Sequence, residues 1–81
     1  MDNIEQDVKV LKRVLNSELF LGKYPLISRV WVEEHGNSRI DIVLNVKEPY
    51  SEYSPFRDEI KSYIRNLAKM AGVTSELAIY P

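Results

Sequence analysis

The chain has 81 residues, enough for one domain with a thin core, because a chain of this length buries only about 60% of its unfolded surface. Its formal net charge of −1 provides no overall attraction to nucleic acid or to anionic membranes. The absence of cysteine excludes disulfides, thiolate nucleophiles and cysteine-ligated metal sites. The polar start MDNIEQDVKV and the lack of an apolar run of about 20 residues predict a cytoplasmic protein with no membrane role.

Apolar residues recur every three or four positions at the start of the chain and predict an amphipathic helix over about residues 3–21. The stripe consists of Ile4, Val8, Leu11, Leu15 and Leu19. Gly22 is placed to end this helix in a left-handed conformation, and Pro25 excludes any continuation.

Two runs rich in β-branched residues follow and predict strands at 26–35 and 39–47, joined by the turn His-Gly-Asn-Ser. A two-residue Gly-Asn turn would pair Trp31 with Ile42, whereas a longer loop pairs Val32 with Ile42 and Trp31 with Val43. A shift of one residue turns every side chain to the other face of the sheet. The longer loop brings the apolar residues together, and we therefore expect that register.

The segment KEPYSEYSPF reads as the one loop of the chain, and a second amphipathic helix is predicted over residues 55–71. Its apolar stripe consists of Phe56, Ile60, Tyr63, Ile64, Leu67, Met70 and Ala71, and Gly72 is the predicted C-cap. Residues 76–80 then predict a short third strand with Leu77 and Ile79 on the core side.

The order α-β-β-α-β predicts an α+β fold, a two-layer α/β sandwich with a three-stranded mixed sheet and both helices on one face. Residues 1–81 are expected to form a single domain, and the last strand should run parallel to the second one through a right-handed crossover. The order of the strands cannot be read from the pattern.

One sheet face is then left without a helix, and the alternation of the strands places Trp31 on it, because Val30 and Val32 face the core. The side chains expected to form a partner-binding surface on this face are Ile27, Arg29, Trp31, Val43, Asn45, Lys47 and Tyr80. Exposed apolar patches mark partner surfaces, and tryptophan, tyrosine and arginine are enriched at binding hot spots. The alternative is that the chain's own loop 48–54 or its termini cover Trp31, or that Trp31 lies flat under Arg29.

The leading hypothesis is therefore a non-enzymatic protein-interaction or assembly module, which docks through the face around Trp31 or by pairing at a strand edge. The expected partner is a protein or a second copy of the chain, in a homo-oligomer or a larger complex such as a virion or a secretion-type assembly. No cofactor is expected.

A second hypothesis rests on basic residues at every fourth position of the second helix, Arg57, Lys61, Arg65 and Lys69. Like charges at this spacing repel one another mildly, so helix stability does not explain them. As a basic ridge they are able to contact nucleic-acid phosphates, although an ordinary solvated helix face is the favoured interpretation.

A third hypothesis concerns the hairpin tip, where Glu33, Glu34, His35 and Asp41 have side chains suited to a metal site or acid–base catalysis. Neighbouring strand residues point to opposite faces, so the spacing is poor for one site. We expect no enzyme and no metal site here.

The element order resembles that of small K-homology-type domains, ribosome-binding-factor domains and the ring-building modules of secretion systems. The resemblance spans the whole chain but lies in element order alone. The chain has no Gly-x-x-Gly loop, and AKMAGV at 68–73 lacks the Ala-x-Gly kink of the ribosome-binding factor. No functional residue is carried over from these families.

Overall fold

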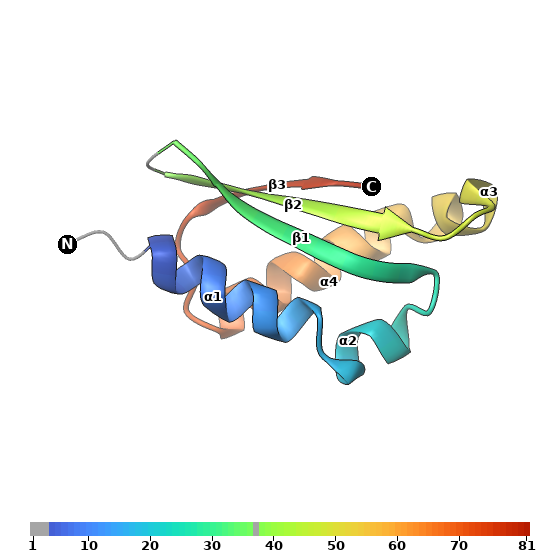
Figure 1. The fold of residues 1–81 in the computed structure, drawn as a ribbon, viewed down its shortest axis with the longest axis horizontal. Coiled ribbons are helices and arrows are strands. Elements are labelled where there is room, and N and C mark those ends of the chain that lie inside the picture. The colour runs from blue at the N-terminus through green and yellow to red at the C-terminus, as the bar shows by residue number, and fades with distance from the viewer. Residues whose placement is uncertain (1–3, 37) are drawn as a thin grey trace.

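The computed structural model describes residues 4–36 and 38–81, and shows five helical segments and three strands within them (Figure 1). In chain order these are α1 (Ile4–Leu15), α2 (Glu18–Lys23), β1 (Ile27–His35), β2 (Arg39–Val46), α3 (Tyr50–Tyr53), a 3₁₀ turn (Ser54–Phe56), α4 (Arg57–Met70) and β3 (Glu76–Tyr80). The mixed sheet and the α-β-β-α-β order of the main elements confirm the predicted α+β class. The predicted helix start at residue 3 and position 37 of the turn lie outside the described residues.

The sheet has the strand order β1-β2-β3, with β1 antiparallel to β2 and β2 parallel to β3. Val32 pairs with Ile42 and Trp31 pairs with Val43, which confirms the longer-loop register. The predicted parallel pairing of the last strand is confirmed as well. β1 and β3 are therefore the two edges of the sheet.

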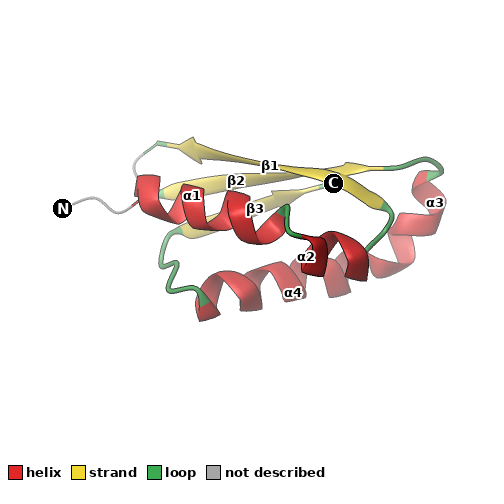
Figure 2. Cartoon of the chain, turned by 60° about the horizontal axis from the view of Figure 1, so that its bottom comes forward, coloured by secondary structure: helices red, strands yellow, loops and turns green. Residues whose placement is uncertain are grey.

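Figure 2 shows α1, α2 and α4 on the same side of the sheet. The burial pattern agrees: Val30, Val32 and Ile42 are at most 2% exposed, whereas Trp31 and Val43 on the other side are 47% and 38% exposed. The core joins both layers and contains Leu11 and Leu15 of α1, the inward side chains of the sheet, and Ile60 and Ile64 of α4. Within residues 4–36 and 38–81, no helix combines the length and apolar character needed to cross a bilayer.

The first predicted helix is wrong in one respect, because residues 16 and 17 divide it into α1 and α2. The backbone at Ser17 is extended, with φ −75° and ψ 159°, and its hydroxyl donates to Val14 O at 2.7 Å and accepts from Phe20 N at 3.4 Å. Ser17 thus ends one helix and caps the next. The break shifts the apolar phase, so that Phe20 is buried and Leu19, predicted in the stripe, is 88% exposed.

Gly22 does not end a helix in a left-handed conformation; it lies inside α2, which continues to Lys23. Gly72 does have a positive φ of 84° after α4, as predicted for a C-cap, and its N–H donates to Lys69 O at 3.1 Å.

The segment predicted as a loop contains α3, whose Tyr53 is fully buried. Of the apolar stripe predicted for residues 55–71, Phe56, Met70 and Ala71 are exposed, the first two at 48% and 83%. The face that α4 buries consists of Ile60, Ile64 and Ala68.

The prediction that Ile27 lies on the open face is wrong, because Ile27 is 2% exposed and belongs to the core. A bulge causes this reversal: Ile27 pairs with Val46 while Arg29 pairs with the adjacent Asn45, so Ser28 is an extra residue in β1. An extra residue turns the side chains that precede it to the opposite face.

Candidate functional site

The open face of the sheet carries an apolar row that crosses all three strands. Trp31 of β1 is paired with Val43 of β2, and Val43 is paired with Tyr80 of β3. The three side chains are 47%, 38% and 44% exposed, respectively. Side chains at paired positions on one face lie about 5 Å apart, so these three form one continuous patch.

The rows on either side of this patch differ in charge. Arg29 and Asn45 are paired on one side of it. Glu33, Asp41 and Ala78 are aligned on the other side. The apolar row therefore separates Arg29 from the carboxylates Glu33 and Asp41.

Arg29 also contacts Trp31 directly, since its guanidinium carbon lies 4.1 Å from the centre of the indole ring. This is a cation–π contact. Arg29 therefore lies over the Trp31 ring, as in the alternative that placed Trp31 under Arg29, and 47% of the Trp31 surface is still open to solvent.

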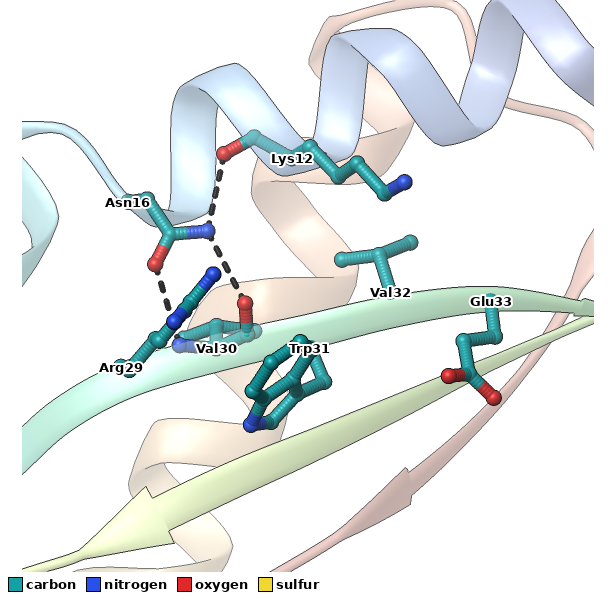
Figure 3. Close-up of a pocket in the computed structure, with 7 residues that line it drawn as sticks. All are labelled: Lys12, Asn16, Arg29, Val30, Trp31, Val32 and Glu33. Atoms are coloured by element: carbon teal, nitrogen blue, oxygen red, sulfur yellow. Dashed lines mark hydrogen bonds between the residues drawn. The ribbon is translucent and has the colours of Figure 1, made fainter.

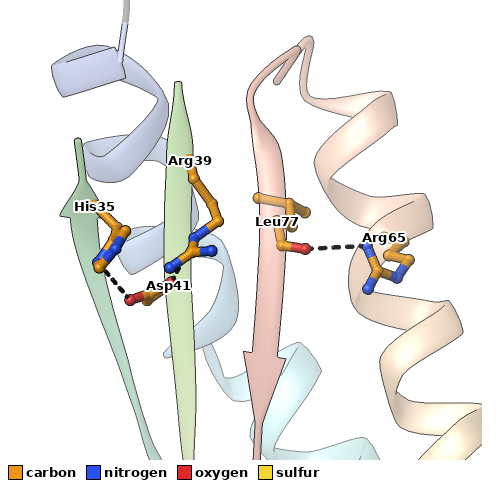
Figure 4. A network of polar contacts seen from close by, with 5 residues as sticks. All are labelled: His35, Arg39, Asp41, Arg65 and Leu77. Atoms are coloured by element: carbon orange, nitrogen blue, oxygen red, sulfur yellow. Dashed lines mark hydrogen bonds and ion pairs between the residues drawn. The ribbon is translucent and has the colours of Figure 1, made fainter. Parts of the chain in front are cut away.

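The hairpin tip holds an ion cluster rather than a set of free ligands (Figure 4). Asp41 Oδ2 lies 3.3 Å from His35 Nδ1, and Asp41 Oδ1 lies 3.3 Å from Arg39 Nε. The Asp41 oxygens therefore already have cationic or imidazole neighbours. Among residues 4–36 and 38–81, no group of three or more His, Cys, Asp or Glu side chains is arranged to hold a metal ion.

A groove of about 610 Å³ runs along the free edge of β1, between that strand and α1 (Figure 3). It is lined by Lys12, Asn16, Arg29, Val30, Trp31, Val32 and Glu33. Figure 3 shows Val32 directed toward α1 and Trp31 on the opposite side of the strand, so the groove connects the helical layer with the open face.

Asn16 occupies one end of this groove. Its side-chain amide donates to Val30 O at 3.0 Å and accepts from Val30 N at 3.0 Å, and the same amide also donates to Lys12 O at 3.0 Å. A side chain thus takes the place of a neighbouring strand at Val30 while satisfying a carbonyl at the end of α1.

The other edge of the sheet has a comparable contact. Arg65 of α4 donates from Nη1 to the outward-facing carbonyl of Leu77 in β3, at 3.3 Å (Figure 4). Both edge strands are therefore bonded to a side chain from a helix, which hinders pairing with a strand from another chain.

The predicted basic ridge is only partly free. Arg57 forms an exposed ion pair with Asp58 at 3.7 Å, and Arg65 is directed to the β3 edge by its bond to Leu77. Lys61 is half-buried, and Lys69 is exposed near the end of α4. Two of the four cations thus have partners within the fold.

Two predicted members of the partner surface lie apart from the others. Ile27 is in the core, as described above. Lys47 follows the end of β2 and lines a groove with Leu21 and Pro25, next to α2. The structure brings together Arg29, Trp31, Val43, Asn45 and Tyr80.

A smaller groove of about 170 Å³ lies between α2 and α4, where Lys23, Tyr24, Phe56 and Glu59 are among its lining residues. Tyr24 donates a hydrogen bond to Glu59 Oε2 at 3.3 Å. Burial, together with the charge and hydrogen bond of Glu59, raises the pKa of Tyr24 to about 12. This tyrosine stays protonated at neutral pH and acts there as a hydrogen-bond donor.

Sequence analysis missed Asn16 and Lys12 as parts of the groove. The bonds of Asn16 join residues 14 positions apart, and no local spacing encodes such a contact. The available signal was Asn16-Ser17-Glu18, a helix-capping pattern placed inside an apparently continuous apolar stripe.

Comparisons of the chain with models of protein families, with curated proteins and with solved structures found no match. The resemblances in element order therefore remain resemblances, and functional inference rests on the open face itself.

Proposed function

We propose that this protein is a non-enzymatic assembly module that docks onto a protein surface through the row Trp31–Val43–Tyr80 and the adjacent Arg29 and Asn45. The observation that carries the proposal is the continuous apolar row across all three strands of a sheet face on which Figure 2 shows no helix. Exposed apolar side chains next to one another mark contact surfaces, and burying each of them against a partner gives favourable free energy.

The chemistry of the row fits a binding hot spot. Tryptophan and tyrosine provide large rigid contact areas, and Arg29 is already ordered against Trp31 by its 4.1 Å contact. An ordered arginine loses little conformational entropy when a partner binds, because its side chain is already restrained.

Docking through the face has more support than docking through an edge. Asn16 occupies the outward hydrogen-bonding groups of Val30, and Arg65 occupies the outward carbonyl of Leu77. A partner strand would have to displace one of these side chains before it could pair with the sheet.

The nucleic-acid alternative has less support. It requires the four cations of the ridge, and Arg57 and Arg65 already have partners within the fold. Strong retention on a phosphate-rich column that falls steeply with salt would favour this alternative.

The proposal is tested with Trp31→Ala and with Leu19→Ala as a matched control, because Leu19 is an 88% exposed apolar residue on α2. Light scattering over a concentration series compares the self-association of the variants and the wild type. Each chain is also immobilised as a bait, to compare which proteins it binds. Trp31→Ala is expected to weaken association about 30-fold, the equivalent of a hot spot of about 2 kcal/mol, while circular dichroism shows a folded domain.

Leu19→Ala is expected to retain every interaction of the wild type. The docking proposal is wrong if Trp31→Ala unfolds the domain, because Trp31 is then a structural residue. It is equally wrong if folded Trp31→Ala keeps all the interactions of the wild type.

A further inference from the structure

In β1, the residues on the two sides of the apolar row have opposite charges. Arg29 lies two residues before Trp31 in β1, and Glu33 lies two residues after it. In β2, Asn45 lies on the Arg29 side and Asp41 on the Glu33 side. Arg29 and Glu33 therefore lie on opposite sides of the row Trp31–Val43–Tyr80. Asp41, on the Glu33 side, is already paired with Arg39 and His35 of the same face.

A two-fold rotation about an axis along this row brings the basic residue of one copy opposite the acidic residue of a second copy. The rotation places a second copy face to face with the first and reverses the strand direction, while each row residue lies over its own equivalent. Arg29 of one copy then lies opposite Glu33 of the other, and Asn45 lies opposite Asp41. Symmetry makes each of these pairs occur twice.

We propose that the partner docked on the open face is a second copy of this chain, related by a two-fold axis that runs along Trp31–Val43–Tyr80. This inference rests on the proposed function and specifies its partner. The two sheets form an aligned sandwich of antiparallel strands, in which the apolar rows pack together and the Arg29 and Glu33 side chains pair across the interface.

Two other arrangements of two copies are less favourable. A two-fold axis along the strands places Glu33 opposite Ala78, with no charge to meet it. Antiparallel pairing of two β1 edges centred on Trp31 also places Arg29 opposite Glu33. That pairing needs the outward hydrogen-bonding groups of Val30, which Asn16 already occupies.

The area of the open face limits how much surface this dimer can bury, and therefore its affinity. The three strands have nine, eight and five residues and lie about 4.8 Å apart, so the face covers roughly 350 Å² per copy. Stable interfaces bury about 800 Å² per partner, so the dimer is expected to be weak and to form at micromolar or higher concentrations.

The first experiment exchanges the charges. Arg29→Glu and Glu33→Arg are each expected to weaken self-association about tenfold or more, since each puts like charges opposite each other in the dimer. An equimolar mixture of the two variants restores opposite charges at both positions and is expected to associate at least as well as the wild type. Recovery in the mixture excludes loss of the Arg29–Trp31 contact as the cause.

The second experiment uses the absence of cysteine in the chain. Position 43 lies in the row, so the two copies of Val43→Cys face each other and are expected to be joined by a short bis-maleimide cross-linker. Glu5→Cys, on the exposed surface of α1, is the control. It keeps the open face but is expected to give no cross-linked dimer under the same conditions, because α1 lies in the helical layer.

The outcomes separate this inference from the proposed function. A wild type that stays monomeric at millimolar concentration and low salt overturns the second-copy inference, and the bait comparison then decides on docking. Self-association that Trp31→Ala abolishes but the charge-exchanged mixture does not restore overturns the two-fold arrangement and leaves the docking face supported. Self-association that Trp31→Ala does not change overturns the second-copy inference, and the bait comparison again decides on docking. A change in Trp31 fluorescence with single-stranded oligonucleotide, and none with rising chain concentration, also overturns the second-copy inference.

Discussion

The side-chain amide of Asn16 pairs with the backbone of Val30 through two hydrogen bonds, each 3.0 Å long. In this geometry the amide of a residue between two helices acts as a short piece of strand at the edge of the sheet. The same amide donates to Lys12 O near the end of α1. One side chain therefore connects the end of a helix to the edge of the sheet, beside the groove that leads to Trp31.

Asn16→Ala is expected to lower the free energy of unfolding by about 1–2 kcal/mol, because it leaves partly buried backbone groups of Val30 without partners. Urea denaturation followed by circular dichroism measures this change. Asn66→Ala, at an exposed position of α4, is the control and is expected to stay within about 0.5 kcal/mol of the wild type. A loss at Asn16 no larger than that at Asn66 would show that the pair with Val30 is not stabilising.

The bulge at Ser28 predicts a clear difference between two apolar residues that the alternation of the strands placed on one face. Ile27→Ala is expected to destabilise the fold by about 2–5 kcal/mol, because Ile27 is 2% exposed and its removal leaves a cavity in the core. Val43→Ala is expected to cost less than about 1 kcal/mol, since Val43 is 38% exposed. Equal effects of the two substitutions in chemical denaturation would contradict the bulged register.

The hairpin register could be predicted because, of the two alignments compared for the turn, only one places Val30 and Val32 with the alternating apolar residues of β2. The position of Ile27 could not, because a bulge is a local choice of the backbone and neither glycine nor proline marks Ser28. The division between α1 and α2 was hidden for a similar reason. The apolar spacing continues through Leu19, while the contact that accompanies the break joins Asn16 to a strand 14 residues away.

The same limits apply to the candidate site. Alternation alone placed Trp31, Val43 and Tyr80 on one face, and the strand order β1-β2-β3 then aligns them in one row. That order depends on how the α4 crossover returns to the sheet, which no local pattern specifies. The charge difference across the row, on which the two-fold arrangement depends, follows from the register and the strand order together.

Tyr24 predicts a loss of stability at high pH. Burial and Glu59 raise the pKa of Tyr24 from 10.0 to about 12, so between these values the folded chain holds a proton that the unfolded chain has lost. The stabilisation is complete below pH 10.0 and is lost as the pH rises through about 12. Burial also raises the pKa of Tyr53, which adds to the loss in the same direction.

Chemical denaturation at a series of pH values tests this linkage. Tyr24→Phe is expected to reduce the decrease in unfolding free energy above pH 10, because phenylalanine has no proton to lose. Tyr50→Phe, at a 48% exposed position, is the matched control. If Tyr24→Phe and the wild type lose stability in parallel above pH 10, Tyr24 does not contribute to the alkaline transition.

The ion cluster at the hairpin tip predicts that divalent metals do not stabilise this protein. His35 and Arg39 both lie 3.3 Å from the carboxylate of Asp41, so a metal ion would have to displace an arginine from its ion pair. Arg39 Nε is buried and would then lose its charged neighbour, which is unfavourable. A ligand stabilises a fold only when it binds the native state more tightly than the unfolded one. Thermal melting with EDTA, Zn²⁺ or Mg²⁺ is therefore expected to give the same midpoint within about 1 °C. A rise of several degrees with Zn²⁺ that disappears in His35→Ala would instead show that the cluster rearranges into a metal site.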